Sequence, residues 1–189
     1  MKRRPRLSAQ PWARAVIIFR NRGAGAGASL SHPHSQIIAT VIMPPRLAAV
    51  IAWARDQHAG SGRCPTCDVL FAELEDGRRL IEVSEQFAAL VPFAASGPFE
   101  TQIVPRQHQP SFAMIEDTAL DELGALLQRS VRRIDDLIGK RPYNFAIESS
   151  LVGANGDAFA HWSLRLLPHL TRPAGFELAS GMSINPSVP

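Results

Sequence analysis

Apolar residues recur every three or four positions between residues 117 and 139, the spacing of an amphipathic helix that packs one face on a sheet. Gly139 lies where this helix is expected to end, because glycine readily adopts the left-handed conformation found just past a helix. Residues 67–74 predict a second helix, and residues 46–58 are helix-like. Apolar runs bounded by Pro and Gly predict strands. The predicted strands are 37–43, 79–83, 87–91, 99–104, 143–149 and 161–167, the last two joined by a turn at 153–156.

This order of elements predicts an α+β fold in which a helix covers one face of a mainly antiparallel sheet. The 189 residues suffice for one large domain or two small ones. An apolar fraction of 46% and a charged fraction of 20% are typical of a soluble globular protein. Every apolar run is too short for a membrane span, and the basic start lacks the apolar core of a secretory signal. We therefore expect no contact with a membrane and a cytoplasmic location.

Charge is unevenly distributed along the chain. Residues 1–55 contain nine Lys or Arg and no acidic residue, whereas the remainder has a formal net charge of −6. A basic nucleic-acid-binding arm would interleave aromatic and basic residues, and this segment does not. The asymmetry favours a field that attracts phosphorylated small molecules over one that binds nucleic acid. For residues 1–14 we expect a solvated basic tail.

The densest chemistry lies in residues 21–36, where a glycine-rich run leads into His32, His34 and Gln36. Side chains alternate along a strand, so these three residues are expected to share one face. Small residues before them let backbone amides approach a phosphate closely. An imidazole held beside a phosphate is what covalent nucleotidyl transfer through histidine requires.

The same segment resembles the signature of the galactose-1-phosphate uridylyltransferase family, which belongs to the histidine-triad superfamily. The resemblance lies in an Asn-Arg-Gly-Ala run, a Gly-x-Ser and a His-Pro-His-x-Gln, all in register. It implies that His34 is the nucleophile and that its second ring nitrogen donates to a backbone carbonyl. The other implied roles are a phosphoryl contact for Gln36, substrate phosphate contacts for Asn21, the Gly27 turn and Ser29, a zinc ligand for His32, and contact with hexose hydroxyls for Glu177 in Ala-Gly-Phe-Glu.

The cysteines, Cys64 and Cys67, stand in a Cys-x-x-Cys pattern that suits a zinc knuckle, a redox pair or chance. A structural zinc site needs two further nitrogen or sulfur ligands, which histidines would have to supply. The family resemblance implies that these are His108 and His161, which gives one closed zinc site with the two cysteines. The remaining candidates, His58 and His169, stand at expected element ends, where we predict exposed side chains.

His161-Trp-Ser163-Leu-Arg165 repeats the spacing of His32-Pro-His34-Ser-Gln36, with serine and arginine at the second and third positions. Two such copies fit the fused histidine-triad-like units of the family. We predict part of a first unit at residues 15–62, with the nucleophile strand, and a complete second unit at 63–189, with the zinc site. Relatives carry their other first-site ligands upstream, including a cysteine pair this chain lacks, so any first metal site at His32 is incomplete.

Taken with the resemblance, these residues predict a nucleotidyltransferase that moves UMP or AMP between a nucleoside diphosphate hexose and a sugar 1-phosphate. The covalent carrier would be His34. The alternative is a zinc-stabilised, non-catalytic fragment that binds a nucleotide sugar or a partner subunit. Expected partners are therefore a nucleotide sugar, a sugar 1-phosphate, and either a second copy of the chain or a complementary half.

Overall fold

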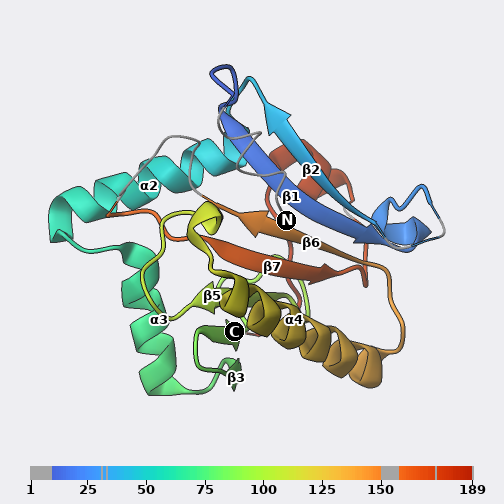
Figure 1. Ribbon diagram of the computed structural model, residues 1–189. Coiled ribbons are helices and arrows are strands. Elements are labelled where there is room, and N and C mark those ends of the chain that lie inside the picture. Colours follow the sequence, from blue (N-terminus) through green and yellow to red (C-terminus); the bar gives the residue numbers. More distant parts are fainter. Residues whose placement is uncertain (1–9, 31, 33, 150–157, 173, 189) are drawn as a thin grey trace.

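The computed structural model describes residues 10–30, 32, 34–149, 158–172 and 174–188. Within these ranges one sheet has the strand order β2-β1-β6-β7-β5-β4-β3, and all neighbouring strands are antiparallel (Figure 1). The strands are β1 (Ala15–Arg22), β2 (Ser35–Thr40), β3 (Leu80–Val83), β4 (Phe87–Leu90), β5 (Thr101–Pro105), β6 (Tyr143–Glu148) and β7 (Ser163–Pro168). The helices are α2 (Pro45–Ser61), α3 (Pro65–Asp76), α4 (Asp117–Ile138) and α5 (Gly175–Ser180), with 3-10 turns η1 (Ala24–Ala26) and η2 (Phe112–Met114).

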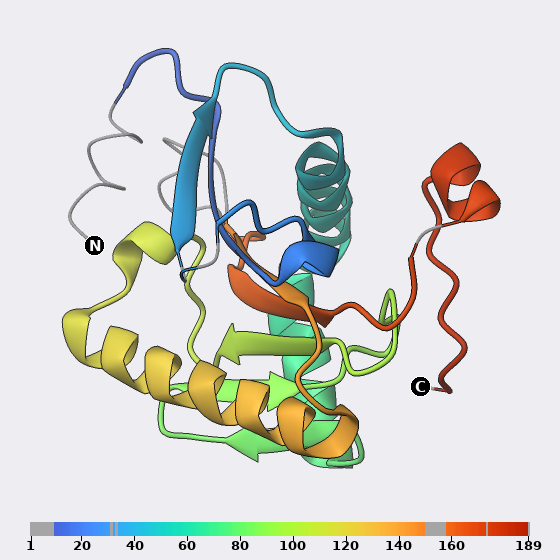
Figure 2. The ribbon, with the colours of Figure 1, turned by 90° about the vertical axis from the view of Figure 1, so that its right-hand side faces the viewer.

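The long helix α4 covers one face of the sheet, as Figures 1 and 2 show. Its apolar stripe includes Leu123 and Leu126, which pack into a cluster with strand residues such as Ile103 and Leu164. Trp162 is fully buried in the same cluster, and its ring makes edge contacts with two phenylalanines. This face holds most of the apolar core.

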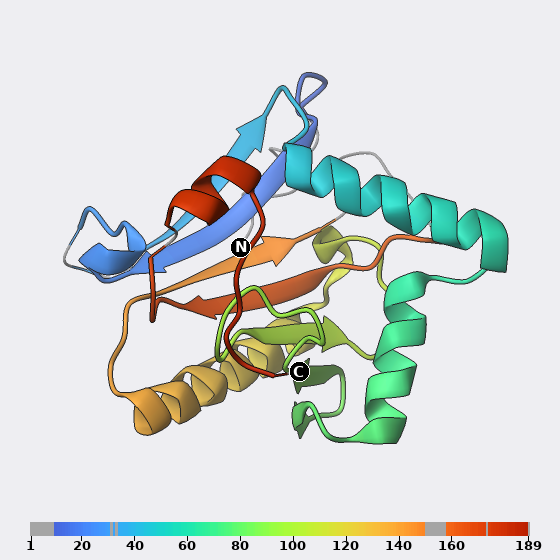
Figure 3. The same cartoon turned by 180° about the vertical axis from the view of Figure 1, so that it is seen from behind.

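Helices α2, α3 and α5 lie on the opposite face of the sheet (Figure 3). Leu70 of α3 packs there against Ala88 and Leu90 of β4 and Val104 of β5. Helix α2 lies over the β1 and β6 side and, with the sheet, lines a cavity of about 270 Å³. In the described part of the chain, no helix is both long and apolar enough to cross a bilayer.

The predicted α+β class and the helix at 117–139 are confirmed, and each of the six predicted strands has a counterpart in the sheet. β1 was not among the predicted strands. The bounds of the predicted strands differ by one to three residues, and two of these differences bear on the site. β2 begins at Ser35 and ends at Thr40, because its partner β1 pairs with it from Arg20 opposite Ser35 to Ala15 opposite Thr40. β7 begins at Ser163, so His161 precedes the strand. The predicted turn at 153–156 lies outside the described residues.

The two predicted parts of the chain share this one sheet. Strands β1 and β2 of the 15–62 part join it because β1 pairs with β6 of the 63–189 part, from Ile18 opposite Ile147 to Arg22 opposite Tyr143. The division into two histidine-triad-like units stays a prediction. Structurally, the two parts are continuous.

Candidate functional site

His34 stands directly before β2 with its imidazole half-buried. Its Nδ1 lies 3.2 Å from the backbone carbonyl oxygen of His32. A carbonyl only accepts hydrogen bonds, so in the neutral ring Nδ1 carries the proton and Nε2 keeps its lone pair. The bond to a backbone carbonyl that the resemblance implies is therefore present, and in the neutral ring it leaves the lone pair of Nε2 available.

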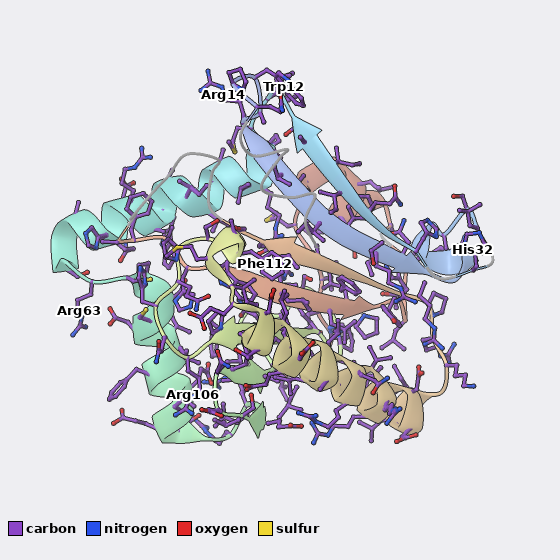
Figure 4. All side chains as sticks on the ribbon, viewed as in Figure 1. Trp12, Arg14, His32, Arg63, Arg106 and Phe112 are labelled. Carbon is purple, nitrogen blue, oxygen red and sulfur yellow. The ribbon has the colours of Figure 1, made fainter. Side chains whose placement is uncertain are left out.

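Strand register brings the other predicted phosphate contacts toward this ring. Gln36 pairs with Phe19 and Ser35 pairs with Arg20, so one further step sets His34 opposite Asn21 at the end of β1. Residues two apart share a face, which places Asn21 and Gln36 on the face that α2 covers. The two histidine rings lie 6.1 Å apart, and His32 is exposed at this end of the hairpin (Figure 4).

The glycine-rich turn links β1 to β2 and depends on glycine at defined positions. Gly23 and Gly27 have φ values of 81° and 78°, which disfavour any residue with a Cβ. A Cβ added at Gly25 would lie 3.0 Å from Cγ of Pro142. The turn is thus shaped by glycine and packed closely on the start of β6.

Three backbone amides of this turn already donate within the turn, and the predicted phosphate cradle stays a prediction. Ala26 N and Ala28 N both donate to Gly23 O, and Gly27 N donates to Ala24 O. These three donors are already used within the turn, so Gly27 contributes a backbone shape and not a free amide. Ser29 follows the turn and is exposed. A phosphate would therefore have to be met by side chains or by other backbone amides of the run.

Glu177 lies on α5, on the same side of the sheet as α2 (Figure 3). Its Oε2 accepts a hydrogen bond of 3.0 Å from the backbone N–H of Ala174. The carboxylate therefore closes the first turn of α5, a role typical of an acidic residue at the third position of a helix. Contact with a hexose stays a prediction for this residue.

A second cluster gathers the predicted metal ligands from three separate segments. Cys64 and Cys67 begin α3, His108 follows β5, and His161 precedes β7. Their candidate ligand atoms all lie within 4.8 Å of one another, and no other such group of His, Cys, Asp or Glu occurs among the described residues. Cys67 Sγ lies 3.4 Å from His108 Nδ1 and 3.3 Å from His161 Nδ1. The set therefore could hold a metal ion, and His32 is not part of it.

Protonation in this cluster suits metal binding only in part. Burial, and then repulsion from His108, lowers the pKa of His161 to about 4, so its imidazole is neutral as a ligand must be. Burial, and then the neighbouring Cys64, raises the pKa of Cys67 to about 12, so the metal-free thiol is protonated. A metal would have to displace that proton. Two sulfur and two imidazole ligands form a typical closed structural zinc set.

Sequence reasoning missed a buried ionic network on the face that α2 covers. Arg165 of β7 is only 11% exposed, and its Nε donates to Glu100 Oε1 at 2.7 Å. Its NH1 donates to Glu148 Oε1 at 3.1 Å, and Arg46 of α2 pairs with the same carboxylate. Sequence spacing carries no signal for this network, because its members come from distant segments, two strands, a helix and a loop, that meet only in the folded chain.

The prediction that His58 and His169 are exposed was wrong. His58 is half-buried in the last turn of α2, with its ring 6.2 Å from that of Phe159. His169 is half-buried after β7, and its Nε2 bonds Oδ1 of Asn144. His58 lies near the end of a helix and His169 just after a strand, but both contact neighbouring segments in space.

The cavity beneath α2 is distinct from the histidine hairpin. Its walls include Leu47 and Ile51 of α2, Ile17 of β1, and Glu148 and Ser163 of the sheet. None of Asn21, His34 and Gln36 lines it. The candidate reactive group therefore lies at the β1–β2 end of the molecule, outside this cavity.

Comparison with known proteins identifies the family of this chain. Residues 19–177 match the family model described as galactose-1-phosphate uridyl transferase, C-terminal domain. The chain belongs to this family. The match covers the histidine hairpin, the Cys/His cluster and the segment through Glu177.

Relatives in the family include both uridylyltransferases and a phosphorylase. The chain is 34% identical over 176 residues to ADP-glucose phosphorylase of Arabidopsis thaliana, covering 92% of this chain and 49% of the relative. It is 31% identical over 191 residues to galactose-1-phosphate uridylyltransferase of Thermotoga maritima, covering 97% and 59%. This chain therefore spans about half the length of these relatives, as their C-terminal portion.

A solved structure of an Arabidopsis thaliana ADP-glucose phosphorylase with bound ADP-glucose superposes on the whole of this chain. The TM-score is 0.91 at 32% sequence identity, and 60% of that protein's chain is covered. A solved uridylyltransferase structure has the same fold, with a TM-score of 0.90 at 23% identity. The sheet and its helices are thus those of the nucleotidyltransferase family.

Proposed function

We propose that this chain carries the covalent histidine of a nucleotidyltransferase that acts on nucleoside diphosphate hexoses. The observation that supports this most directly is the bond from His34 Nδ1 to the His32 carbonyl, which leaves Nε2 unprotonated. Support also comes from family membership and from the relative whose structure holds ADP-glucose. As the C-terminal portion of such an enzyme, the chain would act with whatever supplies the remaining half of the site.

In the proposed reaction, Nε2 of His34 attacks the α-phosphorus of the nucleotide sugar. The N–P bond forms as the bond from phosphorus to the bridging oxygen breaks, and hexose 1-phosphate leaves with the electron pair. A phosphate oxygen of the acceptor then attacks the same phosphorus and releases His34. Splitting one displacement into two in this way predicts ping-pong kinetics.

The neighbouring side chains would hold the transferred group without taking part in bond making. Gln36 and Asn21 can donate amide N–H groups to phosphoryl oxygens, and Ser29 can donate a hydroxyl. Glu177 would accept from hexose hydroxyls, with Oε1, since Oε2 holds the Ala174 amide. We propose either UMP or AMP as the transferred group, because the relatives include uridylyltransferases and an ADP-glucose phosphorylase.

Zinc in the cluster of Cys64, Cys67, His108 and His161 completes the proposal. A closed set of four protein ligands leaves no open position, so the ion would tie α3 to β7 and to the loop after β5. His32 could serve only at a first metal site whose other ligands come from outside this chain. The expected cytoplasmic location, and assembly as a homodimer or with a complementary half, remain part of the proposal.

The decisive experiment is intact-mass measurement after incubation with UDP-glucose or ADP-glucose, quenched at alkaline pH because phosphorus–nitrogen bonds are acid-labile. We expect a UMP or AMP adduct that maps to His34. His34→Ala should abolish the adduct, His58→Ala should keep it, and Ser163→His in a His34→Ala background should not restore it. An adduct on another residue, or full labelling of His34→Ala, would refute the proposed nucleophile.

The second candidate is a non-catalytic, zinc-stabilised chain that binds a nucleotide sugar or a partner subunit. It is favoured by the Cys/His cluster, which could hold a metal ion that stabilises the fold. A folded, zinc-loaded protein that forms no adduct but binds UDP-glucose or ADP-glucose in calorimetry would select it.

A further inference from the structure

Three polar side chains join the end of β7 to the glycine-rich turn. Nε2 of His169 bonds Oδ1 of Asn144 on β6. Nδ2 of Asn144 donates to Oδ1 of Asn21 at 2.7 Å and to the carbonyl of Ala26 at 3.0 Å. Nδ2 of Asn21 donates in turn to the carbonyl of Gly27 at 3.2 Å. The chain of bonds thus runs from a residue after β7 into the turn that precedes the candidate nucleophile.

Backbone carbonyls at two points fix the direction of every bond in this chain. The carbonyl of Ala26 only accepts, so the Asn144 amide must present its NH2 to it and its oxygen to His169. His169 Nε2 must therefore carry a proton and donate. The carbonyl of Gly27 likewise requires the NH2 of Asn21, whose oxygen then receives Asn144. If the amide of Asn144 or Asn21 were flipped, its oxygen would face the carbonyl oxygen of Ala26 or Gly27, and that hydrogen bond could not form.

We propose that His169 and Asn144 are positioning residues that hold the Asn21 amide for a phosphate. This inference rests on the proposed function. An Asn21 amide has two N–H groups, and one is used by Gly27. The second N–H can donate to a phosphoryl oxygen. If the Asn21 amide were flipped, its oxygen would face the phosphoryl oxygen instead and repel it. His169 does not touch the reacting atoms and acts through Asn144.

The same two segments also fix the shape of the turn. Pro142, at the start of β6, lies 3.3 Å from a Cβ placed at Gly23 and 3.0 Å from one placed at Gly25. The carbonyl of Pro142 accepts the backbone N–H of His169 at 2.8 Å. Since Ala26, Gly27 and Ala28 use their amides within the turn, the Asn21 side chain is one donor that this platform can present to an anion.

The test compares His169→Gln with His169→Glu. The glutamine amide can replace the Nε2 donor, whereas the glutamate carboxylate only accepts and faces the oxygen of Asn144. We expect His169→Gln to retain affinity for ADP-glucose or UDP-glucose and His169→Glu to weaken it about 10-fold, the usual cost of losing a buried polar partner. Asn144→Asp, which keeps the shape of the side chain, should weaken it similarly. Equal affinities in the glutamine and glutamate variants would overturn the inference.

Two further measurements separate this inference from the proposed function. Thr171→Glu puts the same charge at an exposed neighbouring position and should leave affinity unchanged, which excludes simple repulsion. The side-chain amide signals of Asn21 in ¹H–¹⁵N spectra need no substrate, and they should move in His169→Glu but not in His169→Gln. Unmoved signals would overturn the hydrogen-bond chain itself. If the signals move but the protein binds neither nucleotide sugar, the series of hydrogen bonds is supported and its role in phosphate binding is refuted.

Discussion

Zinc binding at the Cys/His cluster can be tested most cleanly at His108. His108 is the exposed member of the set, so His108→Gln removes a ligand with little change in packing. Its effect on the metal-free protein should stay within about 0.5 kcal/mol, as for other surface substitutions. The ligand atoms already lie within 4.8 Å of one another without metal, so the site needs little rearrangement to close. The variant should therefore change the response to zinc and not the fold.

The size of that response follows from binding linkage. Free zinc at 1,000 times its dissociation constant stabilises the folded state by about 4 kcal/mol, if the unfolded chain does not bind it. For a chain of this length, 1 kcal/mol moves Tm by about 2–4 °C, so zinc should raise Tm by about 8–16 °C. With three ligands left, the rise in His108→Gln should be less than half as large.

The assay is thermal unfolding of chelator-stripped protein in buffered free zinc, together with metal analysis of the protein as purified. Wild-type protein should carry one zinc per chain. His58→Gln is the matched control, because His58 lies outside the cluster, and it should show the full zinc-dependent rise. A rise in His108→Gln equal to that of wild type would mean that zinc binds elsewhere, and no rise in wild type would remove zinc from the proposal.

Three further predictions concern the core, the surface and the turn. Leu126→Ala should lower stability by about 2–5 kcal/mol in chemical denaturation, whereas Leu178→Ala, at a 77% exposed position, should change it little. The hydrogen bond from Arg129 holds the pKa of Glu82 below its usual value, so this pair stabilises the fold at neutral pH and stops doing so as pH falls through the lowered pKa. Glu82→Gln should thus cost at most about 1 kcal/mol at pH 7 and nothing near pH 2, and a pH-independent cost would contradict the ion pair. Gly27→Ala should cost about 1–2 kcal/mol because φ is 78° there, and it should reduce His34 labelling more than Gly60→Ala, which meets open space.

The elements with strong local patterns were predictable from the sequence. The three-to-four spacing in 117–139 identifies α4 because only one stripe of this helix meets the sheet. The start of β2 was not predictable, since Ser35 and Gln36 are polar and enter the strand only because β1 offers them partners. The Cys/His cluster required the family resemblance, because the four ligands come from distant segments and spacing alone left other histidines open.

Residues that act through strand register escaped the sequence analysis for the same reason. His169 and Asn144 are 25 positions apart, and Arg165 and Glu100 are 65 apart, so no local pattern links them. Each pair forms where neighbouring strands bring side chains to one face. A buried His or Arg can be recognised from sequence as unusual only after its strand partners are known.

The second copy of the histidine pattern lacks the groups that the reaction proposed for the first copy needs. Arg165 stands where Gln36 stands in the first copy, but it is 11% exposed and neutralised by Glu100 and Glu148. Ser163 replaces the nucleophile, and its Oγ accepts a hydrogen bond from Gln102. These contacts consume the groups that a phosphate would need, so the second copy serves as a neutral platform. The first copy reaches that platform through β6, because β1 pairs with β6 and Asn144 of β6 bonds both His169 and Asn21.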